Sequence, residues 1–353
     1  MAMTTTTTSP FSLRLGWWFG MSILCGFLLP STYSYRIGLL VKTFNNEFFQ
    51  LAEQGCKDYV ATFLTHKNST CIYQGPLPTV ENPNPDPDGT VQANMLLEMI
   101  PNVDALAISV KNAEAITPAI QVAIDAGIPV VTFDSDAPDS SRIAYVGTDN
   151  RFLGTTLAKV AKQISPEGGY FATLASDDSP NMNERIKGFQ DEMFAENTGD
   201  DDDDDKDDAN IVWTELSDSP GIFNRDVDVA IDMMEEYAQK DATVIVSVNG
   251  GPMWSDFYAD FYNRNRRKNI TLVFGDDFPL QIDYLSRGYV LGLVGQMPYE
   301  MGYRSTAALH NLLQGMEIPA TIGTNLISHL QVPLVLPDLE VDHSLIGNLH
   351  YVG

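Results

Sequence analysis

Short apolar runs alternate with longer amphipathic stretches from residue 36 onward, and this alternation predicts the class of fold. The apolar runs have the length of strands and are rich in Val and Ile, which is typical of strands buried on both faces of a parallel sheet. We therefore predict strands at 37–41, 105–110, 130–133, 170–174, 211–213, 244–248, 272–274 and 290–294.

The stretches between these runs have the length of helices, and several carry signals that end a helix. Gly127 with Pro129 ends one of them, and Gly315 ends the last long one. Alternation of strands and helices predicts a doubly wound α/β architecture. The length of 353 residues favours two lobes. We predict helices over 47–64, 90–100, 113–126, 151–164, 183–195, 224–239, 253–266, 279–287 and 300–315.

Two low-complexity segments interrupt this pattern. Residues 81–89 are acidic and rich in Pro, so they cannot form a regular element. Residues 199–208 (GDDDDDDKDD) are predicted to be a disordered acidic insertion on the surface. Calcium binding by this Asp run is less favoured, because nothing in the sequence fixes the geometry of its carboxylates.

The N-terminus has the pattern of a signal peptide. The apolar run from Gly16 to Leu29 has 14 residues, which is too short for a bilayer span of roughly 20 residues. Small residues at 32 and 34 predict a signal peptide over 1–34, with cleavage after Ser34 and a secreted or periplasmic product. An uncleaved anchor is the alternative.

Charge and cysteine content narrow the classes of partner. The chain has 21 basic and 47 acidic residues, and a net charge of −26 repels phosphate backbones, so we expect no nucleic-acid partner. The mature chain keeps Cys56 and Cys71, which form either a disulfide or two separate thiols. The acceptor sequons at Asn68 and Asn269 matter only in a source that glycosylates.

Polar and aromatic residues follow five of the predicted strands. In open α/β sheets, ligands bind beyond the carboxyl ends of the strands, so these side chains are expected to meet at one edge. Carboxylates accept hydrogen bonds from hydroxyls, amides donate or accept, and aromatic rings pack against the apolar face of a sugar. The set favours an uncharged polyol: Asn45, Asn46, Phe48 and Phe49; Asp134; Asn249; Asp276 and Asp277; Gln296.

Each of these residues alone is better explained as a turn former, a helix cap or part of the core. Five segments, taken in order, carry a more specific signal: IGLLVKTFNNEFF, GIPVVTFDSDAPDSSRIAYVGTDN, SPNMNERIKGF, FGDDFP and VGQMPYEMG. Together they resemble the type I periplasmic binding proteins for monosaccharides, of which the ribose-binding protein is the familiar example. The resemblance runs from about Arg36 to Gly315.

The resemblance implies a ligand site, two lobes and a hinge of three crossing segments. The first lobe would hold 36–148 plus 297–325 and the second 149–296 plus 326–353, with hinges at 148–150, after Gln296 and near Gly323. In the family, the matching positions bind sugar hydroxyls or pack against the ring. The residues at those positions here are Asn46, Phe48, Phe49, Asp134, Arg185, Phe223, Asn249, Asp276 and Gln296.

Three positions depart from the family pattern. Glu47 stands where Pro is usual, and Gly250 follows Asn249 where Asp is common. Ser135 follows Asp134 where the ribose proteins have Arg, which removes a hydroxyl contact and argues against ribose itself.

The resulting interpretation is a non-enzymatic, monomeric binding protein for a monosaccharide or similar polyol, without a cofactor or a bound metal. Its membrane partner would be a transporter or a receptor, and a ligand-sensing protein of the same fold stays open. A repressor is excluded because an apolar signal replaces a basic DNA-binding headpiece. A glycoside hydrolase that uses Asp134 and Asp276 is the less favoured alternative, since no catalytic motif accompanies them.

Overall fold

The computed structural model describes residues 34–64, 68–82, 84–195, 211–330 and 349–351. The predicted signal peptide, apart from Ser34, and the predicted acidic insertion lie outside the described residues. Among the described residues, no helix combines the length and the apolar character needed to cross a bilayer.

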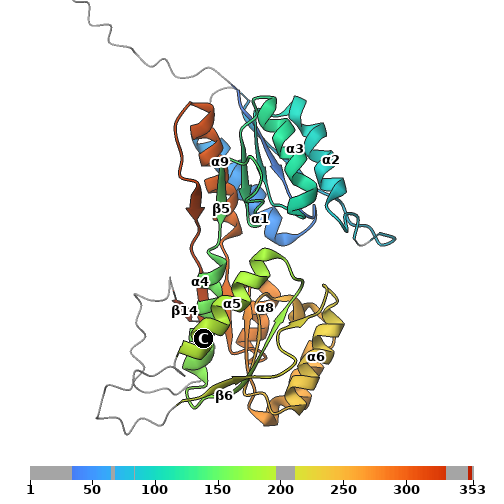
Figure 1. The fold of residues 1–353 in the computed structure, drawn as a ribbon, viewed down its shortest axis with the longest axis vertical. Coiled ribbons are helices and arrows are strands. Elements are labelled where there is room, and N and C mark those ends of the chain that lie inside the picture. The colour runs from blue at the N-terminus through green and yellow to red at the C-terminus, as the bar shows by residue number, and fades with distance from the viewer. Residues whose placement is uncertain (1–33, 65–67, 83, 196–210, 331–348, 352–353) are drawn as a thin grey trace, which may run out of the picture. The chain divides into compact units, whose positions relative to one another are not determined.

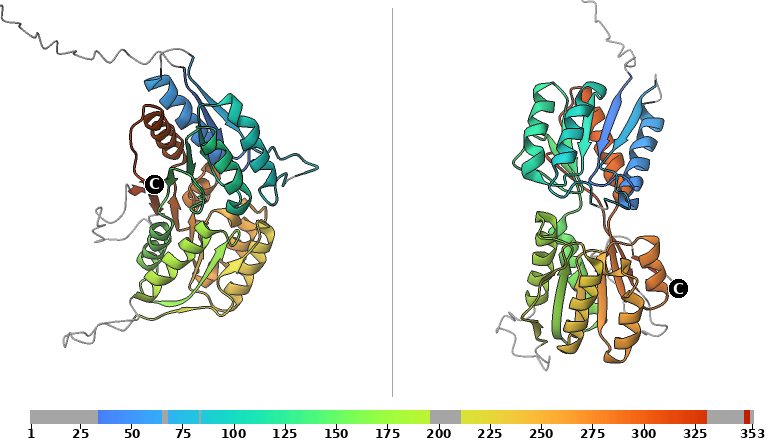
Figure 2. Two further views of the ribbon diagram at one scale, coloured as in Figure 1. Left: turned by 45° about the horizontal axis from the view of Figure 1, so that its top comes forward. Right: turned by 90° about the vertical axis from the view of Figure 1, so that its right-hand side faces the viewer.

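The described chain forms two sheets, each covered by helices on both faces (Figures 1 and 2). In the first sheet the order is β12-β5-β4-β3-β1-β2, and all neighbours are parallel. Its strands are β1 (Arg36–Leu40), β2 (Thr70–Gln74), β3 (Ala105–Ile108), β4 (Val130–Phe133), β5 (Ala144–Gly147) and β12 (Thr321–Gly323).

The second sheet has the order β14-β13-β11-β10-β9-β6-β7, and β8 pairs separately with β6. Its one antiparallel pairing between described strands joins β11 to β13. The strands are β6 (Gly169–Ala175), β7 (Trp213–Glu215), β8 (Gly221–Ile222), β9 (Val244–Ser247), β10 (Thr271–Gly275), β11 (Gly292–Gly295), β13 (Ile327–Leu330) and β14 (Leu349–Tyr351).

Helices bury the apolar strands of each sheet from both sides. One face of the first sheet packs against α1 (Glu47–Phe63) and α9 (Pro298–Leu313), and the other against α2 (Thr90–Met99) and α3 (Ala113–Asp125). The second sheet packs against α4 (Asn150–Ile164) and α5 (Pro180–Ala195) on one face. Its other face carries α6 (Val227–Gln239), α7 (Tyr258–Asn265) and α8 (Pro279–Ser286). The described residues also form short 3-10 turns at η1 (Ile100–Asn102), η3 (Gly251–Trp254) and η4 (Arg266–Lys268).

Glycines let the paired helices approach closely. A Cβ at Gly302 of α9 would lie 1.9 Å from the carbonyl oxygen of Ala52 in α1. A Cβ at Gly154 of α4 would lie 1.9 Å from the carbonyl oxygen of Arg185 in α5. Because no side chain fits at either contact, both helix pairs depend on glycine for their separation, and the second contact fixes the backbone that carries Arg185.

The predicted buried strands are present with ends shifted by one or two residues, but several strands were not predicted. Strand β2 is a partly exposed edge strand of mixed polarity, and β5 has the sequence AYVG with a partly exposed Tyr145, so neither forms a long apolar run. The predicted helix at 253–266 is wrong in extent, since Gly251–Trp254 forms a 3-10 turn and α7 begins only at Tyr258.

A disulfide joins Cys56 of α1 to Cys71 of β2, with Cα atoms 6.0 Å apart. The structure therefore decides between the two alternatives that the sequence left open. The bond closes a loop between residues 15 apart in sequence and ties the edge strand to the helix that covers it. In the chain-entropy model, a disulfide that closes a loop of this length stabilises the folded protein by about 3 kcal/mol.

The chain passes three times between the two sheets. It leaves β5 of the first sheet for α4 and β6 of the second, returns from β11 through α9 to β12, and crosses again to β13. The crossing segments include Thr148, Gln296 and Thr324. This connectivity brings the carboxyl ends of strands from both sheets to the same region.

Candidate functional site

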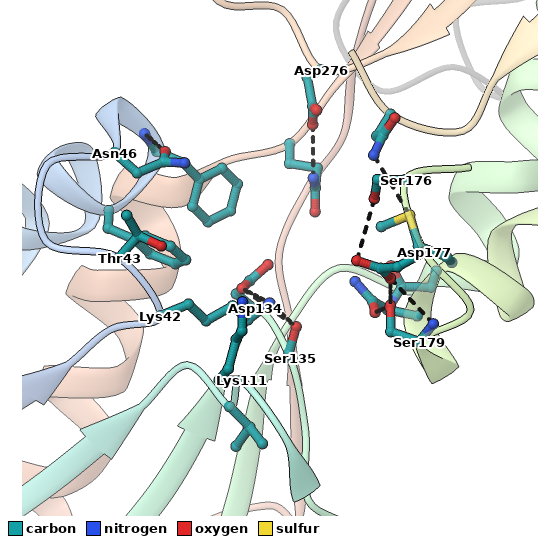
Figure 3. Close-up of a pocket in the computed structure, with 18 of the residues that line it drawn as sticks. Lys42, Thr43, Asn46, Lys111, Asp134, Ser135, Ser176, Asp177, Ser179 and Asp276 are labelled. Atoms are coloured by element: carbon teal, nitrogen blue, oxygen red, sulfur yellow. Dashed lines mark hydrogen bonds and ion pairs between the residues drawn. The ribbon is translucent and has the colours of Figure 1, made fainter. Parts of the chain in front are cut away.

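A cavity of about 810 Å³ lies at the carboxyl ends of the strands and is lined by residues from both lobes (Figure 3). Eight of the nine predicted ligand-binding residues line it, and Phe223 does not. The eight are Asn46, Phe48, Phe49, Asp134, Arg185, Asn249, Asp276 and Gln296.

The first turn of α1 supplies three of these residues. Asn46 is the N-cap, and its side-chain oxygen accepts a hydrogen bond from the Phe48 N–H at 2.9 Å. The rings of Phe48 and Phe49 meet edge to face at 5.3 Å and are mostly buried, yet both reach the cavity. The capping bond uses the Asn46 oxygen, so the amide NH₂ is the group left to donate to a ligand.

Asp134 follows β4 and is held in a left-handed backbone conformation, with φ of 60°. Its Oδ2 accepts a hydrogen bond from the Ser109 hydroxyl at 2.6 Å and forms an ion pair with Lys42 at 2.9 Å. Left-handed φ is uncommon outside Gly, and Asp tolerates it better than most residues. The bonds at Oδ2 leave Oδ1 without a partner among the described residues, so it is available to accept a ligand hydroxyl.

Lys42 is a cavity residue that the sequence analysis missed. Besides its ion pair with Asp134, its ammonium group donates a hydrogen bond to the Ser135 hydroxyl. The sequence showed Ser135 in place of an Arg at this position. The structure instead brings a cation from the segment that follows β1, Lys42, to the carboxylate of Asp134.

Arg185 of α5 is buried, with 2% of its surface exposed, and all its hydrogen bonds go to uncharged oxygens. Nε donates to Asn150 Oδ1 at 2.8 Å, Nη1 to the Val248 carbonyl at 3.1 Å, and Nη2 to Gln296 Oε1 at 2.9 Å. A planar guanidinium with three fixed acceptors is preorganised, which favours planar recognition of ligand oxygens.

Gln296 links this arginine to Asp276. Its Oε1 accepts from Arg185 and from the Thr148 hydroxyl at 3.0 Å, and its Nε2 donates to Asp276 Oδ1 at 2.9 Å. Asp276 is also left-handed, with φ of 66°, and its Oδ2 accepts from the Gly250 N–H at 3.0 Å. Arg185, Gln296 and Asp276 thus form a hydrogen-bonded network at a crossing between the two lobes.

Asn249 and Phe223 lie beside the turn that follows β9. Asn249 Oδ1 accepts from the Ser247 hydroxyl at 3.1 Å and from the Gly251 N–H at 3.2 Å. Phe223 is 1% exposed and belongs to the core of the second lobe. A Cβ at Gly251 would lie 2.5 Å from the Phe223 ring, so this ring packs beneath the turn and not in the cavity lining.

The chain shares this architecture with known proteins. A family model described as a periplasmic binding protein domain matches residues 37–317. The chain belongs to the periplasmic binding protein family. The predicted fold class, two doubly wound lobes of the type I periplasmic binding protein fold, is confirmed by this match and by the structural likeness below.

A curated relative, the D-ribose/D-allose-binding protein of Pseudomonas aeruginosa, is 31% identical over 172 residues, which cover 45% of this chain. The matched stretch spans 50% of that relative's length. A glucose-galactose binding protein from Geobacillus stearothermophilus has a TM-score of 0.69 at 21% identity, covering 86% of this chain and all of that one. A solute-binding protein from Burkholderia graminis, solved with D-arabinose, has a TM-score of 0.66 at 23% identity. The match covers 84% of this chain and 95% of that one.

Relative to the residues expected for a periplasmic binding protein, two further aromatics line the cavity here. Trp254, in the 3-10 turn, is 50% exposed, and its ring lies 6.3 Å from that of Phe278. Phe278, at the start of α8, lies 6.4 Å from Phe48 of the first lobe. The sequence placed Trp254 inside a predicted helix, where it carried no functional signal.

Two more cationic residues of the cavity lining were missed. Lys111 follows β3, and Arg225 follows β8 with φ of 65° and forms an ion pair with Asp177 at 2.7 Å. Burial raises the pKa of Asp177, but hydrogen bonds from Ser179 and Arg225 outweigh it and hold the pKa below its usual range. Burial, followed by the charges of Arg225 and Lys42, lowers the pKa of Lys111 to about 8.

This periplasmic binding protein cavity can hold a hydroxylated ring. It offers carboxylate acceptors, amide and guanidinium donors, and aromatic faces. Asp134 and Asp276 accept hydrogen bonds from Lys42, from the Ser109 and Ser135 hydroxyls and from N–H donors. The described residues also contain no cluster of His, Cys, Asp or Glu arranged to hold a metal ion.

Proposed function

We propose that this protein is a non-enzymatic solute-binding protein that closes its two lobes around a monosaccharide or similar polyol and delivers it to a membrane transporter. The observation that carries the proposal is that eight predicted residues, from separate segments of both lobes, line one cavity. Each of those residue types suits a sugar hydroxyl or the apolar face of a sugar ring.

Relatives support the ligand class and the transport role. The curated relative is named for D-ribose and D-allose, and solved neighbours carry D-arabinose or, in a protein from Agrobacterium vitis, D-fucose. The last two are described as solute-binding proteins of ABC transporters. A ligand-sensing receptor protein of the same fold, the alternative role for this chain, is not favoured by these relatives.

The site residues would act together on the ligand. The Asn46 amide and the Arg185 guanidinium would donate hydrogen bonds, while Asp134 and Asp276 would accept them. A hydrogen bond to a charged group contributes roughly 1.5–3 kcal/mol net. A few such bonds, less the cost of association, reach about −8 kcal/mol, which is near micromolar affinity.

The proposed lobes are 36–148 plus 297–325 and 149–296 plus 326–353. The three crossings between the sheets would serve as the hinge, because they are the points where the chain joins the two halves. Hinge closure around a ligand is a general property of periplasmic binding proteins. Gln296 lies at one crossing and bonds to Arg185 of the second lobe, so ligand contact and hinge angle would be coupled.

We also propose a secreted or periplasmic location for the protein as a monomer. The pattern of residues 1–34 as a cleaved signal peptide supports export. The net charge of −26 supports the absence of a nucleic-acid partner.

A thermal-shift screen over pentoses, hexoses, sugar acids, inositols and small polyols tests the function. A ligand at about 100 times its Kd stabilises the folded state by about 2.7 kcal/mol, which raises the Tm by roughly 5–10 °C. Calorimetry and chromatography of the incubated sugar then separate binding from turnover. A flat screen would remove the proposed sugar-binding function, and a chemically altered sugar would favour the hydrolase.

A further inference from the structure

The charges around the cavity are almost all matched in pairs. The lining carboxylates are bonded to cations or N–H donors: Asp134 to Lys42, Asp136 to Arg142, Asp177 to Arg225, Glu184 to Arg151, and Asp276 to Gly250 and Gln296. The remaining lining carboxylate, Glu47, lies exposed in the first turn of α1, where the helix dipole favours a negative charge. The acidic side chains of the cavity therefore need no cation from a ligand.

The cationic side chains that line the cavity also have partners among the described residues, except Lys111. Lys42 and Arg225 form ion pairs, and Arg185 uses its guanidinium on three uncharged oxygens. The ammonium group of Lys111 makes no ion pair or hydrogen bond with any residue that the structure describes. Only its backbone N–H is used, in a 2.9 Å bond to Gln92 Oε1.

Lys111 lies where an anion would be stabilised. It follows the end of β3 and lines the cavity with Lys42 and Asp134 (Figure 3). Two cations, Arg225 from the opposite lobe and Lys42, act on it more strongly than the carboxylates Asp86 and Asp177 do. Lys111 is thus a cationic position of the cavity lining in a chain that carries −26 overall. Burial adds to the cost of a cation without a partner, and an anion from a ligand would offset that cost.

We propose that the preferred ligand is a sugar acid, a monosaccharide bearing one carboxylate, and that Lys111 selects it by pairing with that carboxylate. This rests on the proposed sugar-binding function and refines it. The hydroxyls would bond to Asn46, Asp134 and Asp276, while the carboxylate lies toward Lys111. One unmatched cation fits a singly charged carboxylate better than a doubly charged phosphate.

Matched ligands test this inference. Calorimetry at pH 7 would compare D-galactose with D-galacturonate, D-glucose with D-glucuronate, and D-ribose with D-ribonate and D-ribose 5-phosphate. We expect at least one sugar acid to bind about tenfold or more tightly than its uncharged parent, the ratio for one charge-assisted bond. Equal or tighter binding of the parents would overturn the inference and leave the sugar-binding function intact. Tightest binding of the phosphate would overturn the choice of carboxylate.

Three variants assign the effect to Lys111. Lys111→Gln should lose about tenfold or more in affinity for the sugar acid and change affinity for the uncharged parent by less than twofold. Lys111→Arg should retain most of the preference for the acid. The control Lys187→Gln removes an exposed lysine of α5 that does not line the cavity. An unchanged acid preference in Lys111→Gln would overturn the role of Lys111, and no binding by any sugar to the unaltered protein would overturn the proposed function itself.

Discussion

The position of Phe223 gives the sharpest test of the site as the structure describes it. The resemblance to the sugar-binding family implied that Phe223 packs against the ligand, whereas the structure buries it to 1% exposure beneath Gly251. Trp254, at 50% exposure, lines the cavity instead. The two aromatics should therefore respond in opposite ways to truncation.

Phe223→Ala should lower the free energy of unfolding and have a smaller effect on ligand affinity. Truncating a buried Phe costs about 3–5 kcal/mol, through lost burial and the cavity that remains. For a lobe of this size that cost lowers the Tm by roughly 6–20 °C. Trp254→Ala removes a half-exposed ring, so we expect a stability loss below about 1 kcal/mol and an affinity loss of about three- to tenfold.

Urea unfolding without ligand measures the first effect, and calorimetry with the best ligand of the screen measures the second. Phe223→Leu serves as the control, because it keeps an apolar side chain of similar size and should retain affinity within about twofold. If Phe223→Leu kept full stability and lost most of its affinity, Phe223 would contact the ligand and our assignment of it to the core would be wrong.

Three further results are expected. Asp134→Ala and Arg185→Ala should each abolish measurable binding in calorimetry while the far-ultraviolet circular dichroism stays native, and unchanged affinity in both would place the ligand elsewhere. Reducing the Cys56–Cys71 disulfide should lower the free energy of unfolding by about 3 kcal/mol in urea titrations with and without reductant, and coincident curves would contradict this. A bound carboxylate would raise the pKa of Lys111 above its unliganded value of about 8, so sugar-acid affinity should be nearly full below about pH 7, fall to about half near pH 8 and fall about tenfold by pH 9. A pH-independent affinity would refute the pairing.

The buried strands were the easiest elements to predict. Strands such as β4 and β9 are buried on both faces, so their sequences are continuous apolar runs that stand out from the chain. Strand β2 was missed because it lies at an edge, where exposed positions take polar residues. Strand β12 was missed because three residues are too few to form a pattern.

The cavity residues, like the strands, include some that the sequence could predict and some that it could not. Residues that follow apolar strands, such as Asp134, Asp276 and Gln296, were predictable because the ends of parallel strands meet at one edge. Lys42 was missed because its role depends on a contact with a residue 92 positions later in the sequence. Trp254 was missed because the predicted helix around it breaks into a short 3-10 turn.

The sequence by itself determined the two-lobed α/β architecture, the family, and the strand ends from which a ligand site would be built, since burial imposes apolar runs and topology places their ends together. Only the tertiary structure decided which side chains reach the cavity and which charges find partners there. Phe223 became part of the core, Lys42 was matched to Asp134, and Lys111 was left unmatched among the described residues. These outcomes depend on distances between segments remote in sequence, and the local pattern of residues does not encode such distances.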